Sequence, residues 1–274
     1  MEKIYAKNTV IFMLDTIIFS LVVAVAVGVS AGYLGSIMVL EKMALVGDAL
    51  SHVALPGLAL GVLLGFNPLI GGFVFLFVSA IIIWHLGRVT KLSFETLVGA
   101  TFTLSLAVGI LLFGDNLDAL EEALFGDISA VGITEAVAAV LISVAVILVT
   151  RLIYRKIVLG LISEELAISK GISIAKTNLL YLLFVSLTVA IGIQITGTLL
   201  VGFLVVTPAA AAKIISSNLT RYLKLSSLFG AISAISGILL SSYFDVPPGP
   251  LVVISGIAIF VIAIIIRWRT KFTS

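Results

Sequence analysis

A chain of 274 residues that is 61% hydrophobic and only 11% charged has too much apolar surface to bury in water. Its mean hydropathy of +1.31 therefore predicts a polytopic membrane protein, with about eight to ten spans at roughly 20 residues each. The absence of cysteine excludes disulfides, thiolate metal sites and iron–sulfur clusters, and a net charge of +2 gives no sign of nucleic-acid binding.

The predicted spans are helical, because long apolar runs stand where a membrane barrel would have short alternating segments. We expect nine of them, at 9–32, 50–66, 69–86, 94–113, 131–150, 178–195, 198–213, 225–243 and 250–266. The first contains a stretch like a signal-peptidase site, but its apolar sequence continues to Leu40, so we interpret it as a retained span. With no internal repeat or soluble domain visible, residues 1–274 are expected to form a single transmembrane domain.

The charges between the spans predict the orientation of the chain. Six acids and no base lie between 114 and 135, whereas five bases and two acids lie between 151 and 177. Because Lys and Arg gather on the cytoplasmic side, we expect 151–177 inside and 114–130 outside. This agrees with the other basic segments if 178–213 forms two short spans that meet near Gln194 and Gly197. The N-terminus then lies outside despite Lys3 and Lys7, unless 9–49 holds an extra crossing or a re-entrant piece.

The segment GDALSHVALPG, residues 47–57, holds the first candidate site. Asp48 and His52 are four residues apart, so both side chains lie on one helix face and can reach one ion. Pro56 lacks the N–H that would bond the carbonyl of His52, which leaves that carbonyl free for water, a side chain or a cation. Carboxylate and imidazole suit zinc, manganese or iron, and a two-fold dimer would supply four such ligands. The alternative is that Asp48 caps a helix starting at Ala49 while His52 sits at the membrane interface.

The segment SEELAISKGI, residues 163–172, lies in the most basic inner loop, 151–177. Ser163 is suited to cap a short helix that has Glu164 and Glu165 in its first turn, and Gly171 is placed to end it in the left-handed conformation. Such a helix either docks into a groove of a partner protein or contacts only lipid headgroups, and both interpretations stay open.

The segment TGTLLVGFLVVTPAAAA, residues 196–212, is a span interrupted by Gly197, Gly202 and Pro208. We expect either a kink that lines a pore or a structural kink packed by small residues. Small residues recur elsewhere as Gly28-x-x-x-Gly32, and in two overlapping repeats at 57–65. These spacings favour close helix packing in a bilayer.

Several motifs that would indicate an enzyme fail. GVSAG at 28–32 lies in an apolar helix rather than at a strand-to-helix turn, and Ser30 has no plausible His partner. GISIAKT at 171–177 is one residue short of a phosphate loop, so no nucleotide site is expected in this chain. No H-E-x-x-H is present, and His85 beside Trp84 is expected to anchor an inner span end.

Four segments taken together resemble the membrane subunit of the zinc, manganese and iron ABC importers. They are MALVGDALSHVALPGLALG at 43–61, LFGDI at 124–128, EELAISKGI at 164–172 and GTLLVGFLVVTPAAAA at 197–212. The resemblance implies a homodimeric, multi-pass permease of the cytoplasmic membrane that is not itself an enzyme and binds no cofactor. A separate cytoplasmic ATPase would bind ATP, and an extracytoplasmic metal-binding protein would deliver the ion.

The resemblance also implies roles for particular residues. Asp48 and His52 would be ligands on the metal pathway. The coupling element that receives the motion of the ATPase would be formed by Glu164, Glu165, Leu166, Ala167 and Gly171. Which metal is carried does not follow from oxygen and nitrogen ligands alone.

Two other transport functions stay open. An ABC permease for a siderophore or corrinoid would need a roomier cavity and no special role for His52. An ion-coupled secondary transporter would show inverted repeats and paired intramembrane acids, and the sequence shows neither.

Overall fold

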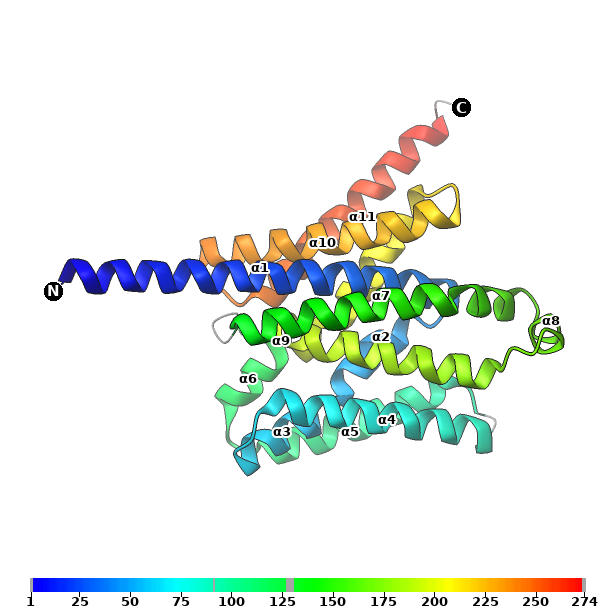
Figure 1. Ribbon diagram of the computed structural model, residues 1–274, viewed down its shortest axis with the longest axis horizontal. Helices are drawn as coiled ribbons and strands as arrows, with labels where there is room; N and C mark the ends of the chain where they lie inside the picture. The colour runs from blue at the N-terminus through cyan, green and yellow to red at the C-terminus, as the bar shows by residue number, and fades with distance from the viewer. Residues whose placement is uncertain (1, 91, 127–130, 273–274) are drawn as a thin grey trace.

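The structure is a computed structural model, which describes residues 2–90, 92–126 and 131–272. Every regular element in these ranges is an α-helix (Figure 1). The helices are α1 (Glu2–Leu40), α2 (Ala44–Val53), α3 (Leu55–Leu64), α4 (Pro68–Thr90), α5 (Phe94–Phe113), α6 (Leu117–Phe125), α7 (Ile133–Ile162), α8 (Glu164–Ser169), α9 (Ile174–Ile215), α10 (Leu219–Phe244) and α11 (Pro248–Phe272). The predicted all-helical fold class is confirmed.

Nine segments of the described chain are long and apolar enough to cross a membrane, which confirms the predicted number of spans. One span, Val46–Leu64, is made of α2 and α3 together, and α9 holds two spans, Ile174–Gln194 and Thr196–Ile215. Two helices extend well past the predicted spans. Helix α1 continues to Leu40 because its last turns are buried against protein, and α7 continues to Ile162 because exposed Arg and Lys side chains do not interrupt a helix.

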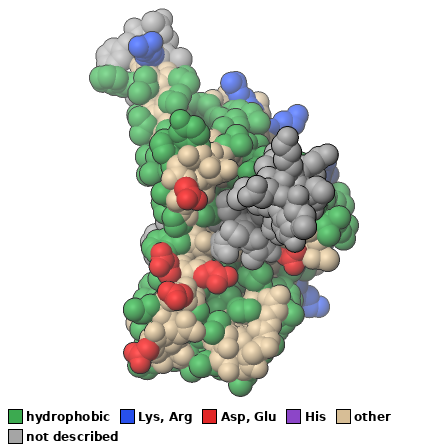
Figure 2. Space-filling model, turned by 90° about the vertical axis from the view of Figure 1, so that its left-hand side faces the viewer, with side chains coloured by type: hydrophobic (Ala, Val, Ile, Leu, Met, Phe, Trp, Pro, Cys, Tyr) green, Lys and Arg blue, Asp and Glu red, His purple; other side chains and the backbone are tan. Residues whose placement is uncertain are grey.

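The helices form a bundle (Figure 1), and its acidic and basic segments lie toward different ends. Helix α8 lies at one end, which we call the inner end because it carries the basic segment 151–177, and α6 lies toward the opposite, outer end. Figure 2 faces the outer end and shows acidic side chains spread across it; Asp115, Asp118, Glu121 and Glu122 are all exposed. This distribution agrees with the orientation predicted from Lys and Arg.

The chain termini lie at opposite ends of the bundle, with the N-terminus on the side away from α8 (Figure 1). Helix α1 is continuous from Glu2 to Leu40, and α2 starts at Ala44. The proposed extra crossing or re-entrant piece within 9–49 is therefore wrong. With the orientation predicted from Lys and Arg, the nine candidate spans of the described chain put the N-terminus outside, so its two lysines depart from the charge rule.

Glycines let the helix backbones touch. A Cβ atom added at Gly28 would lie 2.5 Å from the carbonyl oxygen of Gly230, so α1 and α10 cross with their backbones in contact. A Cβ at Gly57 would overlap the Gly71 carbonyl in the same way, joining α3 to α4. The predicted packing role is confirmed for these positions but is wrong for Gly65, which has nothing within 4 Å and ends α3 in the left-handed conformation at φ 73°.

A pair of single-methyl substitutions tests this packing. Gly28→Ala should destabilise the bundle by about 1–3 kcal/mol, because the new methyl group meets backbone that cannot move aside. Gly99→Ala is the matched control, because a Cβ there meets nothing within 4 Å; replacing a helical glycine should raise stability by up to about 1 kcal/mol. Thermal unfolding in detergent measures both, and equal shifts in Tm would contradict the packing model.

Candidate metal centre and coupling segment

The candidate metal segment is a helix broken near its middle. Helix α2 ends at Val53 and α3 begins at Leu55, with Pro56 in the first turn of α3. The N–H of Ala54 turns toward the carbonyls of Ser51, at 3.3 Å, and His52. The predicted helix break is present. The hydrogen bond of the Ala54 N–H is to Ser51, and the availability of the His52 carbonyl to water or a cation stays a prediction.

Asp48 and His52 lie one turn apart on α2, inside the span Val46–Leu64. Helix α2 starts at Ala44 after the N-cap residue Met43, so the alternative that Asp48 caps a helix is wrong. His52 is only 7% exposed, and its imidazole packs on the ring of Phe102 at a centroid distance of 5.1 Å, so the side chain faces protein in this structure.

The described chain does not give His52 a full set of hydrogen-bond partners, and it leaves Asp48 uncovered. The Nδ1 atom of His52 is buried and has no hydrogen-bond partner among the described residues. The side chain of Asp48 is exposed on the surface of the single chain. Within the described ranges, no three His, Cys, Asp or Glu side chains come together to hold a metal ion. One copy thus offers two ligand side chains and an open face beside them.

Gly202 on α9 lies directly against Asp48. A Cβ at Gly202 would overlap the Cα atom of Asp48 and lie 2.8 Å from its Oδ1 atom. The sequence predicted that Gly202 interrupts the span, which is wrong, because Gly197 is the position within α9 with non-helical angles. Gly202 instead allows α2 to pack directly on α9.

The break in α9 lies where the sequence placed the junction of two short spans. Gly197 has φ 70° and ψ 175°, a conformation that only glycine adopts readily. A Cβ there would overlap the carbonyl of Leu124 at the end of α6. Pro208 is buried inside the second span, where it is accommodated within the helix. The predicted kink is thus at Gly197, with α6 lying across it.

The predicted coupling segment folds locally as expected. Ser163 caps α8 by accepting a hydrogen bond from the Leu166 N–H at 3.2 Å, and Gly171 ends it at φ 73°. Glu164 and Glu165 occupy the first turn and are exposed. Ala167 is fully buried, whereas Leu166 is 45% exposed at the inner end of the bundle. The helix therefore presents acidic and apolar side chains outward from a buried anchor.

The outer end contains a cavity of about 330 Å³ between α3, α4, α5, α6, α7 and α9. Glu122, Glu135, Asn67 and Gln194 contribute polar side chains to its wall. The carboxylate of Glu135 already accepts hydrogen bonds from the Gly132 N–H at 3.1 Å and the Thr134 hydroxyl at 2.8 Å. The cavity is consequently acidic without forming a ligand cluster.

Within the described residues, nine candidate spans, one of them broken beside the Asp48–His52 pair, give the architecture of a multi-pass membrane protein. Residues 13–267 match the model of the ABC 3 transport family, and the chain belongs to that family. It is an ABC-type permease of the cell membrane.

Characterised relatives cover almost the whole chain. The manganese import system permease protein ScaB of Streptococcus parasanguinis is 32% identical over 92% of this chain and 91% of its own length. The high-affinity zinc uptake system membrane protein ZnuB of Haemophilus influenzae is 31% identical over 94% of this chain and 100% of its own. Among solved structures, PsaBC from Streptococcus pneumoniae in complex with Fab matches with a TM-score of 0.79 and 31% identity, covering 92% of this chain and 90% of that one.

The structure adds two residues whose part in the site the sequence did not reveal. Phe102 packs on His52 from α5, and nothing in the local sequence distinguishes it from other apolar residues of that span. Gly202 stood out as a glycine in a span, but its contact with Asp48 depends on how α2 and α9 cross.

The contact at Gly202 generates a prediction. Gly202→Ala should push α2 away from α9 and lower transport by about tenfold or more, because a misplacement of reacting groups by about 1 Å is costly. Gly99→Ala is again the control. Transport assays with matched expression check the effect, and full activity in Gly202→Ala would show that the close approach is not required.

Proposed function

We propose that this chain is the permease subunit of an ABC importer for a divalent transition metal. Manganese and zinc are the metals named for the relatives, and iron suits the same oxygen and nitrogen ligands. The observation that carries the proposal is the Asp48–His52 pair, held inside the bundle with a buried unpartnered Nδ1 and an exposed carboxylate. Ionisable groups inside a membrane protein are expensive and usually functional.

The metal site requires a second copy of the chain. Two ligands are too few for a divalent transition metal, whereas a two-fold dimer that apposes the Asp48 faces would supply two carboxylates and two imidazoles. Carboxylate and neutral imidazole bind such an ion without the affinity of thiolates. This favours the release that transport requires, since a site must be weak enough to let its ion leave.

Energy for transport would come from a separate cytoplasmic ATPase that contacts α8. The exposed Glu164, Glu165 and Leu166 are suited to a groove of a partner protein, because a short amphipathic helix binds through such an apolar and charged face. At the outer end, the acidic surface is suited to receive cations from an extracytoplasmic metal-binding protein (Figure 2).

The metal site is tested by removing its ligands. Asp48→Ala and His52→Ala should each lower metal uptake by at least roughly 10–100-fold, since even outer-shell changes at metal sites cost that much. His85→Ala is the matched control, because His85 is exposed near the end of α4. Uptake is measured as cellular metal content by mass spectrometry, in cells that lack other importers and express the chain with its ATPase and binding protein. Normal uptake in both ligand variants would refute the site, and uptake of an organic metal chelate instead would favour a siderophore or corrinoid permease.

The coupling segment is tested at an exposed position. Leu166→Asp should weaken ATPase binding by about tenfold, because an apolar contact is replaced by a charge in the interface. Leu117→Asp is the control, since Leu117 is 68% exposed on α6 and lies outside the candidate spans. Co-purification with the ATPase and metal-stimulated ATP hydrolysis are measured together. Equal behaviour of the two variants would exclude α8 as the docking element.

A further inference from the structure

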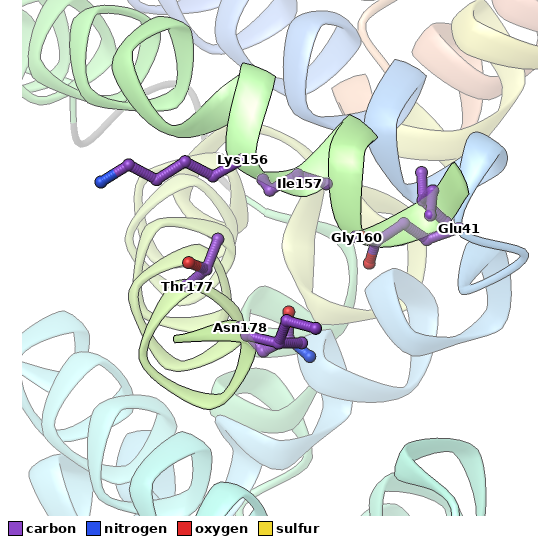
Figure 3. Close-up of a pocket in the computed structure, with 8 residues that line it drawn as sticks. Glu41, Lys156, Ile157, Gly160, Thr177 and Asn178 are labelled. Carbon is purple, nitrogen blue, oxygen red and sulfur yellow. The ribbon is translucent and has the colours of Figure 1, made fainter. Parts of the chain in front are cut away.

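A cavity of about 210 Å³ lies near the inner end, between the α1–α2 turn and the helices on either side of α8 (Figure 3). Glu41 enters its wall from the turn, Lys156 and Gly160 from α7, and Thr177 and Asn178 from α9. In Figure 3 the ammonium group of Lys156 points away from Glu41. None of these residues belongs to the metal site or to α8 itself.

Glu41 lies in the short turn that leads into α2, the helix that carries Asp48 and His52. The turn from α1 to α2 is short, with Lys42 in the left-handed conformation at φ 61°. The Glu41 N–H bonds the Ile37 carbonyl at 2.9 Å and the Met43 N–H bonds the Met38 carbonyl at 2.9 Å. Because this turn is tied to α1 and leads directly into α2, a force on Glu41 is transmitted to the start of the helix that carries Asp48.

The opposite walls of the cavity are tied to the coupling segment. Gly160 is in the last turn of α7, just before α8, and Thr177 is in the first turn of α9, just after it. A displacement of α8 therefore moves two walls of the cavity relative to the third wall, which is the α1–α2 turn. The empty volume gives these walls room to approach one another.

The carboxyl group of Glu41 lies in the α1–α2 turn, on the wall of the cavity that faces α7 and α9. Glu41 follows directly after the span that ends at Leu40, and among the described residues it has no ion pair or side-chain hydrogen bond. Burial raises the pKa of the Glu41 carboxyl to about 7. The charged or titratable groups around it are Lys156 from α7, exposed Lys42 in its own turn, and Tyr181 from α9, with Tyr222 of α10 next to Tyr181. The Tyr181 hydroxyl is engaged with the Leu34 carbonyl at 3.0 Å, which leaves Lys156 as the cation lining the cavity.

We propose that Glu41 is a positioning residue that links the coupling segment to the metal-bearing helix, through an ion pair with Lys156 that forms across this cavity when the inner end closes. The proposal rests on the proposed transport function. Lys156 has a long, flexible side chain that can turn toward Glu41 when the walls of the cavity approach one another. Pairing would then draw α7 toward the α1–α2 turn and shift α2 with it.

The link predicts a definite dependence on pH at the inner face. Pairing with Lys156 lowers the pKa of Glu41, so the closed form binds fewer protons than the form described here. Closure is then fully favoured above the Glu41 pKa of about 7 in the open form. Below that pH it becomes less favourable by up to about tenfold per unit, until the pKa of the closed form is reached.

The proposal is tested by a distance measurement that does not depend on transport. The chain has no cysteine, so Ala44→Cys on α2 and Ile162→Cys on α7 give one pair of spin labels in each copy when the ATPase is used in a cysteine-free form. Ile162 is exposed and does not line the cavity. The complex with its ATPase is placed in lipid nanodiscs with a non-hydrolysable ATP analogue, one pH unit below and one above the Glu41 pKa of about 7. The population with the shorter distance should be several-fold larger at the higher pH.

Variants separate the ion pair from a merely structural role. Glu41→Gln and Lys156→Gln should each abolish the pH dependence of the distance, Glu41→Asp should retain it, and Lys224→Gln at an exposed inner position should leave it unchanged. A pH dependence that persists in Glu41→Gln, or is absent from the unsubstituted complex, overturns the proposal. Manganese uptake by the same complex in proteoliposomes reports on the proposed function separately. A complex that takes up no metal but shows the pH-dependent distance would refute transport of this ion and support the link.

Discussion

A backbone group without a hydrogen-bond partner costs on the order of several kcal/mol in hydrocarbon, so a membrane helix can break only where protein covers the break. Both breaks within the spans obey this constraint. Ala54, between α2 and α3, and Leu55, the first residue of α3, are fully buried. Gly197 in α9 is covered by the end of α6, whose Leu124 carbonyl occupies the place that a Cβ atom at residue 197 would take. The positions of these covered breaks determine where α2 and the second half of α9 can meet.

Where α2 and α9 meet, the lack of a side chain at Gly202 determines how closely the two helices pack. Gly202 lets α2 lie directly on α9, with Asp48 at the contact, while Phe102 closes over His52 from α5. Hydrophobic burial adds little between helices that are already in lipid, so close contact at small residues supplies much of the attraction. The same contacts that hold the bundle together therefore fix the backbone of the candidate metal ligands. A change at Gly202 and a change at Asp48 act on one structural unit.

Hydropathy was sufficient to predict the spans and their number, because the lipid sets the length of an apolar run. Local chemistry was sufficient for α8, where Ser163 and Gly171 determine both ends of the helix. It failed at Asp48, which resembled an N-cap although α2 starts at Ala44. It also missed α6, although the signals were present: the Asn116 side chain caps the helix by accepting a hydrogen bond from the Ala119 N–H at 3.3 Å, and Leu117, Leu120 and Leu124 recur at helical spacing among the acids. The partners of His52 and Gly202 come from helices distant in sequence, so no local pattern could reveal them.

The two candidate ligands differ in burial: the side chain of Asp48 is exposed on the single chain, whereas that of His52 is buried. The imidazole packs against Phe102 within one chain, whereas the carboxylate is exposed on the surface of that chain. In the mechanism we propose, assembly of two copies completes the ligand set, and small shifts of α2 take it apart. Helix α2 is bounded by the Glu41 turn at one end and by the break at Ala54 at the other. In the proposed mechanism α2 would shift as a short unit between these two points, and the shift would have to loosen the contact of Asp48 with Gly202 for the ion to leave.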